Sequence, residues 1–275
     1  MRILFFCFCF AIIYCPVSAQ EDTSFRLIRK LKGDFVDFTV DDLNNIYTVN
    51  SRNQVKKYNA NGDSVAVFND VRKFGQASLI DVSNPLKILL YYRDFATVVV
   101  LDRFLNAVNV IDLRKLGVFQ ARAIGQSYDN KIWVYDDVEN KLKKIDESGK
   151  QELETVDLRQ VLGQSISPVK IFDENRYVYV YDPQKAMYVF DYFGTMKNGI
   201  LISGWSNLKL AGRYIFGSKG DSLYRYEIKT FLYDQWKMPG AILESRSFNF
   251  TSDKLYALKK DDLETMPTIH IYSIK

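Results

Sequence analysis

Carboxylate side chains gather in four polar segments along the chain, and groups of this kind can bind a cation. They are Asp136, Asp137 and Glu139, then Asp182, then Asp221, and finally Asp261, Asp262 and Glu264. A bound calcium ion needs several such oxygens converging on one point. The alternative is that these segments are solvated turns, which are rich in Asp. No cofactor and no metal ligand are therefore assigned, and calcium is the alternative that these carboxylates leave open.

Three segments share the pattern Asp, apolar, Arg, basic or polar, apolar, and a closing Gly. They are residues 70–75, 112–117 and 157–163. One interpretation is a repeated one-turn helix, with Asp as its N-cap and Gly as its C-terminal stop. The other is that Arg72, Arg114 and Arg159 form an arc of guanidinium groups that binds an anionic ligand or a partner protein.

The sequence contains almost no histidine and none of the common catalytic or cofactor-binding motifs. His270 is the one histidine, which removes multi-histidine zinc sites and makes any Ser-His-Asp triad depend on this residue. The chain has no glycine-rich phosphate loop, Gly-x-Ser-x-Gly elbow, metal-spaced Cys/His set or Rossmann fingerprint. No catalytic residue is assigned, and the sequence favours a binding protein over an enzyme.

The composition predicts a globular β-protein. The chain has 275 residues, of which 47% are hydrophobic and 25% charged, so neither disorder nor a low-complexity fibre fits. A net charge of +4 is too small to indicate a nucleic-acid surface. Aromatic residues make up 15%, with Tyr 18 and Phe 19, and this excess favours strands.

Residues 1–19 have the pattern of a secretory signal peptide. Arg2 precedes an apolar stretch from Ile3 to Tyr14, and a small-x-small site predicts cleavage after Ala19. The alternative is a lipoprotein anchored through Cys15, although Tyr14 stands where lipid-attachment sites place a small residue. Either interpretation predicts an exported protein in the periplasm, at the outer membrane or secreted.

The predicted mature chain, residues 20–275, is a single domain without cysteine. All three cysteines, Cys7, Cys9 and Cys15, lie in the leader, so no disulfide is expected. No second stretch of about 18 apolar residues follows, so no transmembrane segment is expected in the mature chain.

Six repeats of strand-forming sequence follow the leader. Each has a half-apolar strand, a polar turn and a second strand, and four of them continue clearly to a third strand and another turn. Equivalent positions in the second strands are Ile46, Ile88, Ile132, Val178, Ile215 and Leu255. Their spacings are 42, 44, 46, 37 and 40 residues, the period of a propeller blade. The sequence predicts an all-β, six-bladed β-propeller with four antiparallel strands per blade.

The ends of the chain are expected to complete one blade together. The sixth repeat stops at its third strand, residues 268–274. The missing outer strand is predicted at residues 25–31, because pairing the two terminal strands removes an exposed sheet edge.

Residues 37–65, DFTVDDLNNIYTVNSRNQVKKYNANGDSV, resemble a blade of the NHL-repeat type. The match consists of a hydrophobic strand, an acidic-Asn turn, an Ile-Tyr strand, a polar hairpin and a strand ending at Asn-Gly. The His-Arg that usually follows the second strand is missing. The resemblance implies a six-bladed propeller, in which inter-blade connections and hairpins between second and third strands share one functional face.

Aromatic side chains and one glycosylation sequon have two interpretations each. Tyr177, Tyr179 and Tyr181 alternate on one face of a predicted strand, and the tryptophans are Trp133, Trp205 and Trp236. Packing between blades explains them more simply than sugar stacking. The sequon at Asn249 falls in a predicted inner strand, where we expect it to be unused.

Three functions compete at this stage. The first is an exported, non-catalytic interaction module that binds another envelope or secreted protein, for example as a subunit of an outer-membrane assembly, through Arg72, Arg114 and Arg159. The second is a metal-assisted, lactonase-like hydrolase in which a cation activates water. The third is a glycan-binding propeller. Fold alone does not separate them, because propellers carry many functions.

Overall fold

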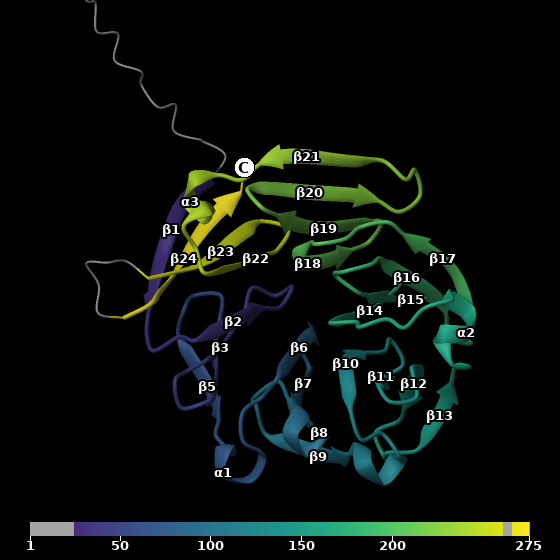
Figure 1. Cartoon of the computed structure of the whole chain (residues 1–275). Helices are drawn as coiled ribbons and strands as arrows, with labels where there is room; N and C mark the ends of the chain where they lie inside the picture. The colour runs from purple at the N-terminus through teal and green to yellow at the C-terminus, as the bar shows by residue number, and fades with distance from the viewer. Residues whose placement is uncertain (1–24, 261–265, 275) are drawn as a thin grey trace, which may run out of the picture.

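The structure is a computed structural model that describes residues 25–260 and 266–274 (Figure 1). The predicted signal peptide and its cleavage site lie outside the described residues, as do Asp261, Asp262 and Glu264. None of the helices in the described ranges has the length and apolar character needed to cross a membrane.

Six four-stranded antiparallel sheets form a ring, as the repeats predict (Figure 1). Blade 1 contains β2 (Asp37–Val40), β3 (Ile46–Val49), β4 (Val55–Tyr58) and β5 (Ser64–Phe68). Blade 2 contains β6 (Leu79–Asn84), β7 (Lys87–Tyr92), β8 (Thr97–Asp102) and β9 (Ala107–Asp112). Blade 3 contains β10 (Ala121–Gln126), β11 (Ile132–Asp136), β12 (Lys141–Ile145) and β13 (Gln151–Glu154).

The other half of the ring repeats this order of strands. Blade 4 contains β14 (Lys170–Glu174), β15 (Tyr177–Tyr181), β16 (Met187–Asp191) and β17 (Met196–Ile200). Blade 5 contains β18 (Ser206–Ala211), β19 (Tyr214–Lys219), β20 (Ser222–Glu227) and β21 (Tyr233–Lys237). Blade 6 contains β22 (Ser247–Phe250), β23 (Lys254–Lys259), β24 (Thr268–Ile274) and, from the other end of the described chain, β1 (Phe25–Lys32).

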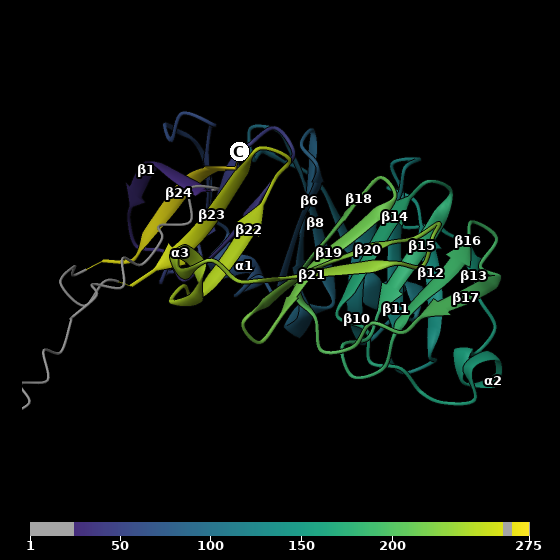
Figure 2. The same cartoon turned by 90° about the horizontal axis from the view of Figure 1, so that it is seen from above.

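The strand β1 closes the ring, which confirms the predicted closure. It pairs antiparallel with β24, from Phe25 opposite Ile274 to Lys32 opposite Thr268. The register shifts once, between Leu27 and Arg29. Figure 2 shows β1 beside β24 at the edge of blade 6. The edge that β24 would otherwise expose is therefore paired within the chain.

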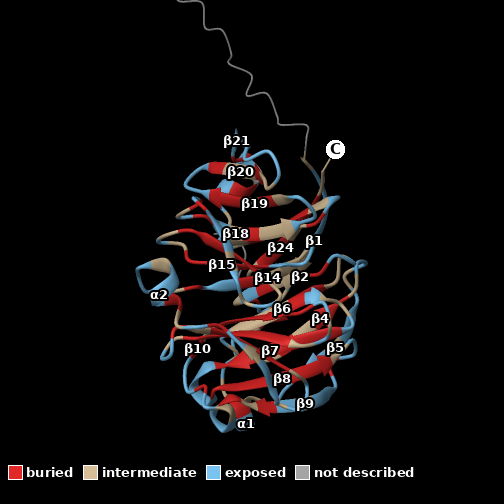
Figure 3. Cartoon of the chain, turned by 90° about the vertical axis from the view of Figure 1, so that its right-hand side faces the viewer, coloured by how far each residue is buried: buried red, intermediate tan, exposed pale blue. Residues whose placement is uncertain are grey.

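The hydrophobic core lies between neighbouring blades. The second strand of blade 2, β7, is buried along its whole length, and Leu89 of this strand packs with Ile124 and Ile132 of blade 3. In Figure 3 the buried residues concentrate in middle strands such as β7 and β8, whereas β9 at the outer edge is largely exposed. The aromatic and β-branched excess of the sequence thus serves mainly to pack blade against blade.

The innermost strands approach one another closely at Gly125. A Cβ atom at this position of β10 would lie 2.6 Å from the carbonyl oxygen of Ile171 in β14. Glycine is therefore required for blades 3 and 4 to meet at this point.

Short helices occupy the connections between blades, as the repeated Asp-to-Gly pattern predicts. They are α1 (Val71–Phe74), η2 (Leu113–Leu116) and α2 (Leu158–Leu162), and α3 (Gly240–Leu243) occupies a further connection. The short helix η1 (Arg93–Phe95) instead lies within blade 2, between β7 and β8. Asp112 and Asp157 act as N-caps. The same prediction is wrong for Asp70, whose side chain makes no capping hydrogen bond to α1.

Candidate functional site

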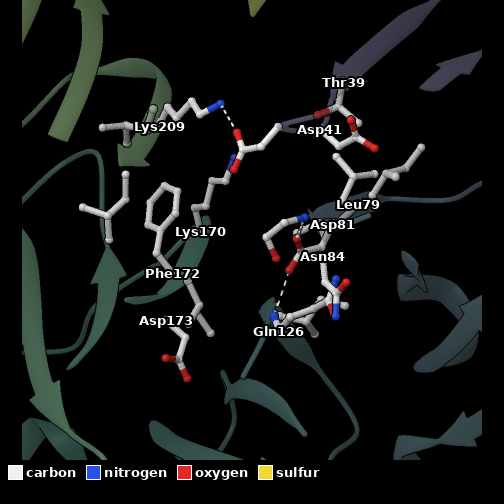
Figure 4. A pocket seen from close by; sticks show the side chains of 18 of the residues that line it. Thr39, Asp41, Leu79, Asp81, Asn84, Gln126, Lys170, Phe172, Asp173 and Lys209 are labelled. Carbon is white, nitrogen blue, oxygen red and sulfur yellow. Dashed lines mark hydrogen bonds and ion pairs between the residues drawn. The ribbon is translucent and has the colours of Figure 1, made fainter. Parts of the chain in front are cut away.

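A cavity of about 520 Å³ lies at one end of the central channel and is lined by residues from all six innermost strands (Figure 4). Its lining extends to the ends of the first strands and to the turns that join them to the second strands, at Asp42, Tyr128 and Glu174. In an antiparallel blade these turns lie at the end opposite to the inter-blade connections. The cavity is therefore on the side of the ring opposite to the face that the NHL resemblance implies.

A second cavity, of about 700 Å³, lies where the innermost strands β2 and β6 begin. Asp37, Arg93, Asp94 and Arg246 contribute its charged groups. Residues at the beginning of an innermost strand directly follow an inter-blade connection. This second cavity is accordingly on the side that the resemblance implies, although none of the three predicted arginines lines it.

The carboxylate of Asp41 holds the first turn of blade 1. Its oxygens accept hydrogen bonds from the backbone N–H of Leu43 and Asn45, at 3.0 and 2.8 Å. They also accept from the Asn45 side-chain amide at 2.8 Å and from the Tyr47 hydroxyl at 3.0 Å. Burial, and then the charge of Asp41, raise the pKa of Tyr47, so this hydroxyl stays protonated and donates.

The carboxylate of Asp173, at the end of β14, joins blade 4 to blade 3. One oxygen accepts from Ser127 Oγ at 2.8 Å, from Tyr128 N at 3.3 Å and from Trp133 Nε1 at 2.9 Å. The other oxygen accepts from the Tyr192 hydroxyl at 2.6 Å. Four donors surround this group, so its oxygens are already used in holding the fold.

The ammonium of Lys144 fills an aromatic cage beside Asp173. It lies 5.2, 5.0 and 5.5 Å from the ring centroids of Tyr128, Trp133 and Tyr192. It also donates to Asp129 Oδ2 at 2.8 Å. Cages of this kind bind cations through the ring faces. Here the occupant is the chain's own lysine, so the cage serves the fold.

Two lysines from neighbouring blades reach the cavity. Lys209 of β18 donates to Asp42 Oδ1 at 2.5 Å and to the Phe250 carbonyl at 3.2 Å (Figure 4). Lys170 of β14 lines the cavity with its side chain among Asp81 and Lys209. Burial lowers the pKa of Lys170, Lys209 lowers it further, and the charge of Asp81 opposes the shift without cancelling it.

The three predicted partner-binding arginines lie on successive inter-blade connections, and α1 and α2 stand at separate points on the outer edge of the ring (Figure 1). Arg72 is exposed on α1. Arg114 donates from Nε and Nη2 to the Phe95 carbonyl, at 3.0 and 2.5 Å. Arg159 pairs with its own N-cap, Asp157, at 2.5 Å. Two of the three guanidinium groups thus have partners within the chain, and their role in binding stays a prediction.

The predicted acidic hairpins have partners where the structure describes them. Asp136 and Glu139 contact Lys143 at 2.8 and 2.6 Å, and Asp137 contacts Arg122 at 3.0 Å. Asp182 accepts the backbone N–H of Ser167 and Gln184. Asp221 accepts from the Ser222 hydroxyl. Within residues 25–260 and 266–274, no group of three or more His, Cys, Asp or Glu could hold a metal ion.

The aromatic residues divide between core and surface. Tyr179, Tyr181, Trp133 and Trp205 are buried, which agrees with packing between blades, whereas Tyr177 and Trp236 are exposed. Asn249 lies in the inner strand β22, as expected, and donates to the Phe38 carbonyl of blade 1 at 3.2 Å. The histidine, His270, lies in β24 with Nδ1 3.3 Å from the Tyr272 hydroxyl.

The sequence interpretation missed the charged residues of the cavity. Lys170, Lys209 and Asp81 all occur within predicted innermost strands or directly beside them. Because an innermost strand of a propeller faces either the channel or a neighbouring blade, a charged residue there is a signal for a channel-facing group.

Comparison with known proteins identifies the fold of the chain but assigns it to no family. The chain matches no family model and no curated protein. It is similar to a catalytically inactive virginiamycin B lyase from Staphylococcus aureus with quinupristin, at 13% identity over 91% of this chain and 100% of the other, with a TM-score of 0.62.

Two further solved structures give the same result. The Pan2 WD40 domain of Neurospora crassa is 8% identical over 91% of this chain and 95% of the other, with a TM-score of 0.61. A chain of a mitotic checkpoint complex is 10% identical over 100% and 99%, with a TM-score of 0.57. At these identities the likenesses show the propeller fold alone.

Proposed function

We propose that this chain is an exported, non-catalytic propeller that binds another envelope or secreted protein. The observation that carries the proposal is an exposed apolar cluster on blade 5, which we name the blade 5 edge. It consists of Phe231, Leu232, Tyr233 and Trp236, whose exposed fractions are 66, 68, 65 and 46%. Large exposed apolar clusters are typical of protein-binding surfaces, and Trp and Tyr contribute strongly to their binding energy.

The backbone of the blade 5 edge is open to a further strand. Every residue of β21 is exposed, and this strand pairs only with β20, at the outer end of its sheet. Arg225 lies 5.4 Å from the Trp236 ring centroid and pairs with Asp234 at 2.6 Å, which fixes the ring orientation. An extended, apolar segment of a partner protein fits this arrangement, because it can pair with β21 and cover the aromatic rings.

The contacts that the carboxylates make within the chain favour a binding role over a catalytic one. Asp41, Asp136, Asp173 and Asp182 each accept hydrogen bonds or an ion pair from groups of the chain itself. A catalytic acid or base must instead be able to reach a substrate.

The test is recovery of a partner by the tagged protein from its native envelope. A variant with Leu232→Ser and Trp236→Ser is expected to lose at least about tenfold in recovery, because hot-spot residues carry most of the binding energy. Both side chains are largely exposed, so the fold is expected to keep its melting temperature. The matched control carries Val65→Ser and Val67→Ser on β5, two exposed apolar residues of another outer strand.

A second variant separates the two surfaces. Replacing Arg72, Arg114 and Arg159 together by Ala tests the arginine face. Loss of the partner in this variant with full recovery in the blade 5 variant would place the contact on the arginine face and overturn the assignment to blade 5. Full recovery by both variants would reject both surfaces.

A further inference from the structure

Tyr128 and Tyr192 form a stacked pair of rings between blades 3 and 4. Tyr128 lies in the turn that joins β10 to β11, and Tyr192 lies in the turn that joins β16 to β17. Their ring centroids are 4.5 Å apart, with an angle of 12° between the ring planes. A nearly parallel pair covers one face of each ring. Tyr128 nevertheless keeps 67% of its surface exposed, so its other face is open to solvent.

Neighbouring groups fix the ring of Tyr128 without covering this open face. The backbone N–H of Tyr128 donates to the Asp173 carboxylate at 3.3 Å, and the Tyr192 hydroxyl donates to the same carboxylate at 2.6 Å. The ammonium of Lys144 is 5.2 Å from the ring centroid of Tyr128 and 5.5 Å from that of Tyr192. Because these two distances are nearly equal, Lys144 lies beside the stack and not over its outer side. A ring held in this way loses little freedom when it binds a ligand.

The open face of Tyr128 borders a cavity of the right size for a small molecule. Tyr128 lines the cavity of about 520 Å³ at the end of the channel, whereas Tyr192, on its covered side, does not. Tyr128 thus stands between Tyr192 and the cavity. Sites for small molecules typically have volumes of about 300–1,000 Å³.

Two polar side chains from the neighbouring blades lie on either side of Tyr128 in the cavity lining. Asn84 ends β6 in blade 2, and Figure 4 shows it in the wall of the cavity. Its Oδ1 accepts the backbone N–H of Leu86 at 3.0 Å, which fixes the orientation of the amide. Glu174 ends β14 in blade 4. Among the described residues, no hydrogen bond or ion pair involves the amide nitrogen of Asn84 or the carboxyl of Glu174. A donor and an acceptor are therefore available to a ligand on the ring.

The surroundings of Tyr128 discriminate among molecules that pack on an aromatic ring. A cation is disfavoured, because the ammonium of Lys144 is already 5.2 Å from this ring. A phosphate-bearing ligand is disfavoured by the carboxylates of Asp173 and Glu174. A flat apolar molecule would leave Asn84 and Glu174 without hydrogen bonds. A sugar ring instead offers an apolar C–H face together with hydroxyl groups that both donate and accept.

We propose that Tyr128, Asn84 and Glu174 bind a short neutral oligosaccharide at the edge of the channel cavity. One sugar ring packs its C–H groups on the open face of Tyr128, where the π electrons concentrate negative charge. The Asn84 amide donates to one hydroxyl, and Glu174 accepts from another. This site belongs to blades 2, 3 and 4, so it goes beyond the proposed protein binding at the blade 5 edge and does not depend on it.

The test is titration of the purified protein with maltotetraose, cellotetraose, chitotetraose and xylotetraose, followed by calorimetry and saturation-transfer NMR. At least one of them is expected to bind with a dissociation constant of about 1 mM or tighter. Tyr128→Ala is expected to weaken this binding at least about tenfold, because the stacking contact is lost. Tyr128→Phe keeps the ring and is expected to bind within about threefold of the unchanged protein.

Two further variants control for folding and for exposed aromatic surface. Phe193→Ala is the matched control, since Phe193 is 84% exposed next to Tyr192 and does not line the cavity, and it is expected to leave binding unchanged. Asn84→Asp keeps the oxygen that accepts from Leu86 and removes the amide donor. It is expected to weaken binding at least about threefold, and it provides the test if Tyr128→Ala does not fold. The melting temperature of each variant reports its folding.

Three results would overturn the proposal. The first is that none of the four tetrasaccharides binds with a dissociation constant below about 10 mM. The second is that Tyr128→Ala, or Asn84→Asp where Tyr128→Ala is unfolded, binds as tightly as the unchanged protein. The third is that tetramethylammonium binds more tightly than every saccharide, which would make the open ring face a cation site.

Discussion

The ion pair between Lys143 and Asp136 shows how single residues support the hairpins. The side chains are 3 and 0% exposed, their charged atoms lie 2.8 Å apart, and Glu139 is a second partner of Lys143 at 2.6 Å. Burial alone would lower the pKa of Lys143, but these two carboxylates outweigh it and raise the pKa. Lys143 therefore remains protonated at neutral pH and is held within the fold by its two carboxylate partners.

Removing one member of this pair is expected to destabilise the protein strongly. Lys143→Met leaves Asp136 as a buried, uncompensated charge, which costs about 3–5 kcal/mol in the free energy of unfolding. Urea unfolding measures the change. The control is Lys141→Met, because Lys141 pairs with Glu154 at a more exposed position, and such pairs contribute at most about 1 kcal/mol. Equal losses in the two variants would contradict the argument.

The residues of the candidate site were predictable only in part. The repeat assigned Lys170 and Lys209 to innermost strands, which is enough to bring them near the channel. The pairing of Lys209 with Asp42 was not predictable, because the two residues are 167 positions apart and meet only once the ring has closed. Whether a charged group is committed or free therefore depends on the whole fold.

At the scale of elements, the period of the sequence predicted the order of strands well. The six second strands and the closing strand β1 all lie where the repeat places them. Strand β14 ends in two acidic residues, Asp173 and Glu174. Polar residues can end a strand without leaving it when a neighbouring blade supplies hydrogen-bond donors, as Ser127 and Trp133 do for Asp173.

Removing the closing strand β1 is expected to destabilise the whole propeller. Deletion of residues 20–32 takes away the whole of β1, and with it the pairing to β24 and the packing of Leu31 against the core between blades 6 and 1. A loss of about 3 kcal/mol lowers the melting temperature of a domain of this size by roughly 6–12 °C. Calorimetry measures the shift.

A matched control keeps the strand and changes only its surface. Arg26→Ala with Lys30→Ala leaves the backbone pairing of β1 intact, and both side chains are exposed. This double variant is expected to melt within about 2 °C of the unchanged protein, because exposed substitutions usually cost little. An unchanged melting temperature after the deletion would mean that the pairing of β1 with β24 does not stabilise the fold.

At the scale of the whole molecule, acidic residues of this propeller link one blade to another. Asp173 links blades 3 and 4, and Asp42 links blade 1 to blade 5 through Lys209. The amino-acid composition gives only a small net charge and does not show that these acids link blades. The fold class can therefore be predicted from the sequence repeat. The choice of partner depends instead on which surface groups make no contact within the chain after folding.

The response to calcium separates a binding propeller from a metal-assisted hydrolase. A cation at one hundred times its dissociation constant stabilises a protein by about 2.7 kcal/mol, which would raise the melting temperature by several degrees. We expect a shift below about 1 °C, measured against sodium chloride at equal ionic strength, because Asp41 and Asp173 would have to give up their hydrogen bonds to bind a cation. A clear rise would contradict the non-catalytic proposal. Its loss in an Asp42→Asn and Glu174→Gln variant, but not in Asp234→Asn at the exposed blade 5 edge, would place the cation at the channel cavity.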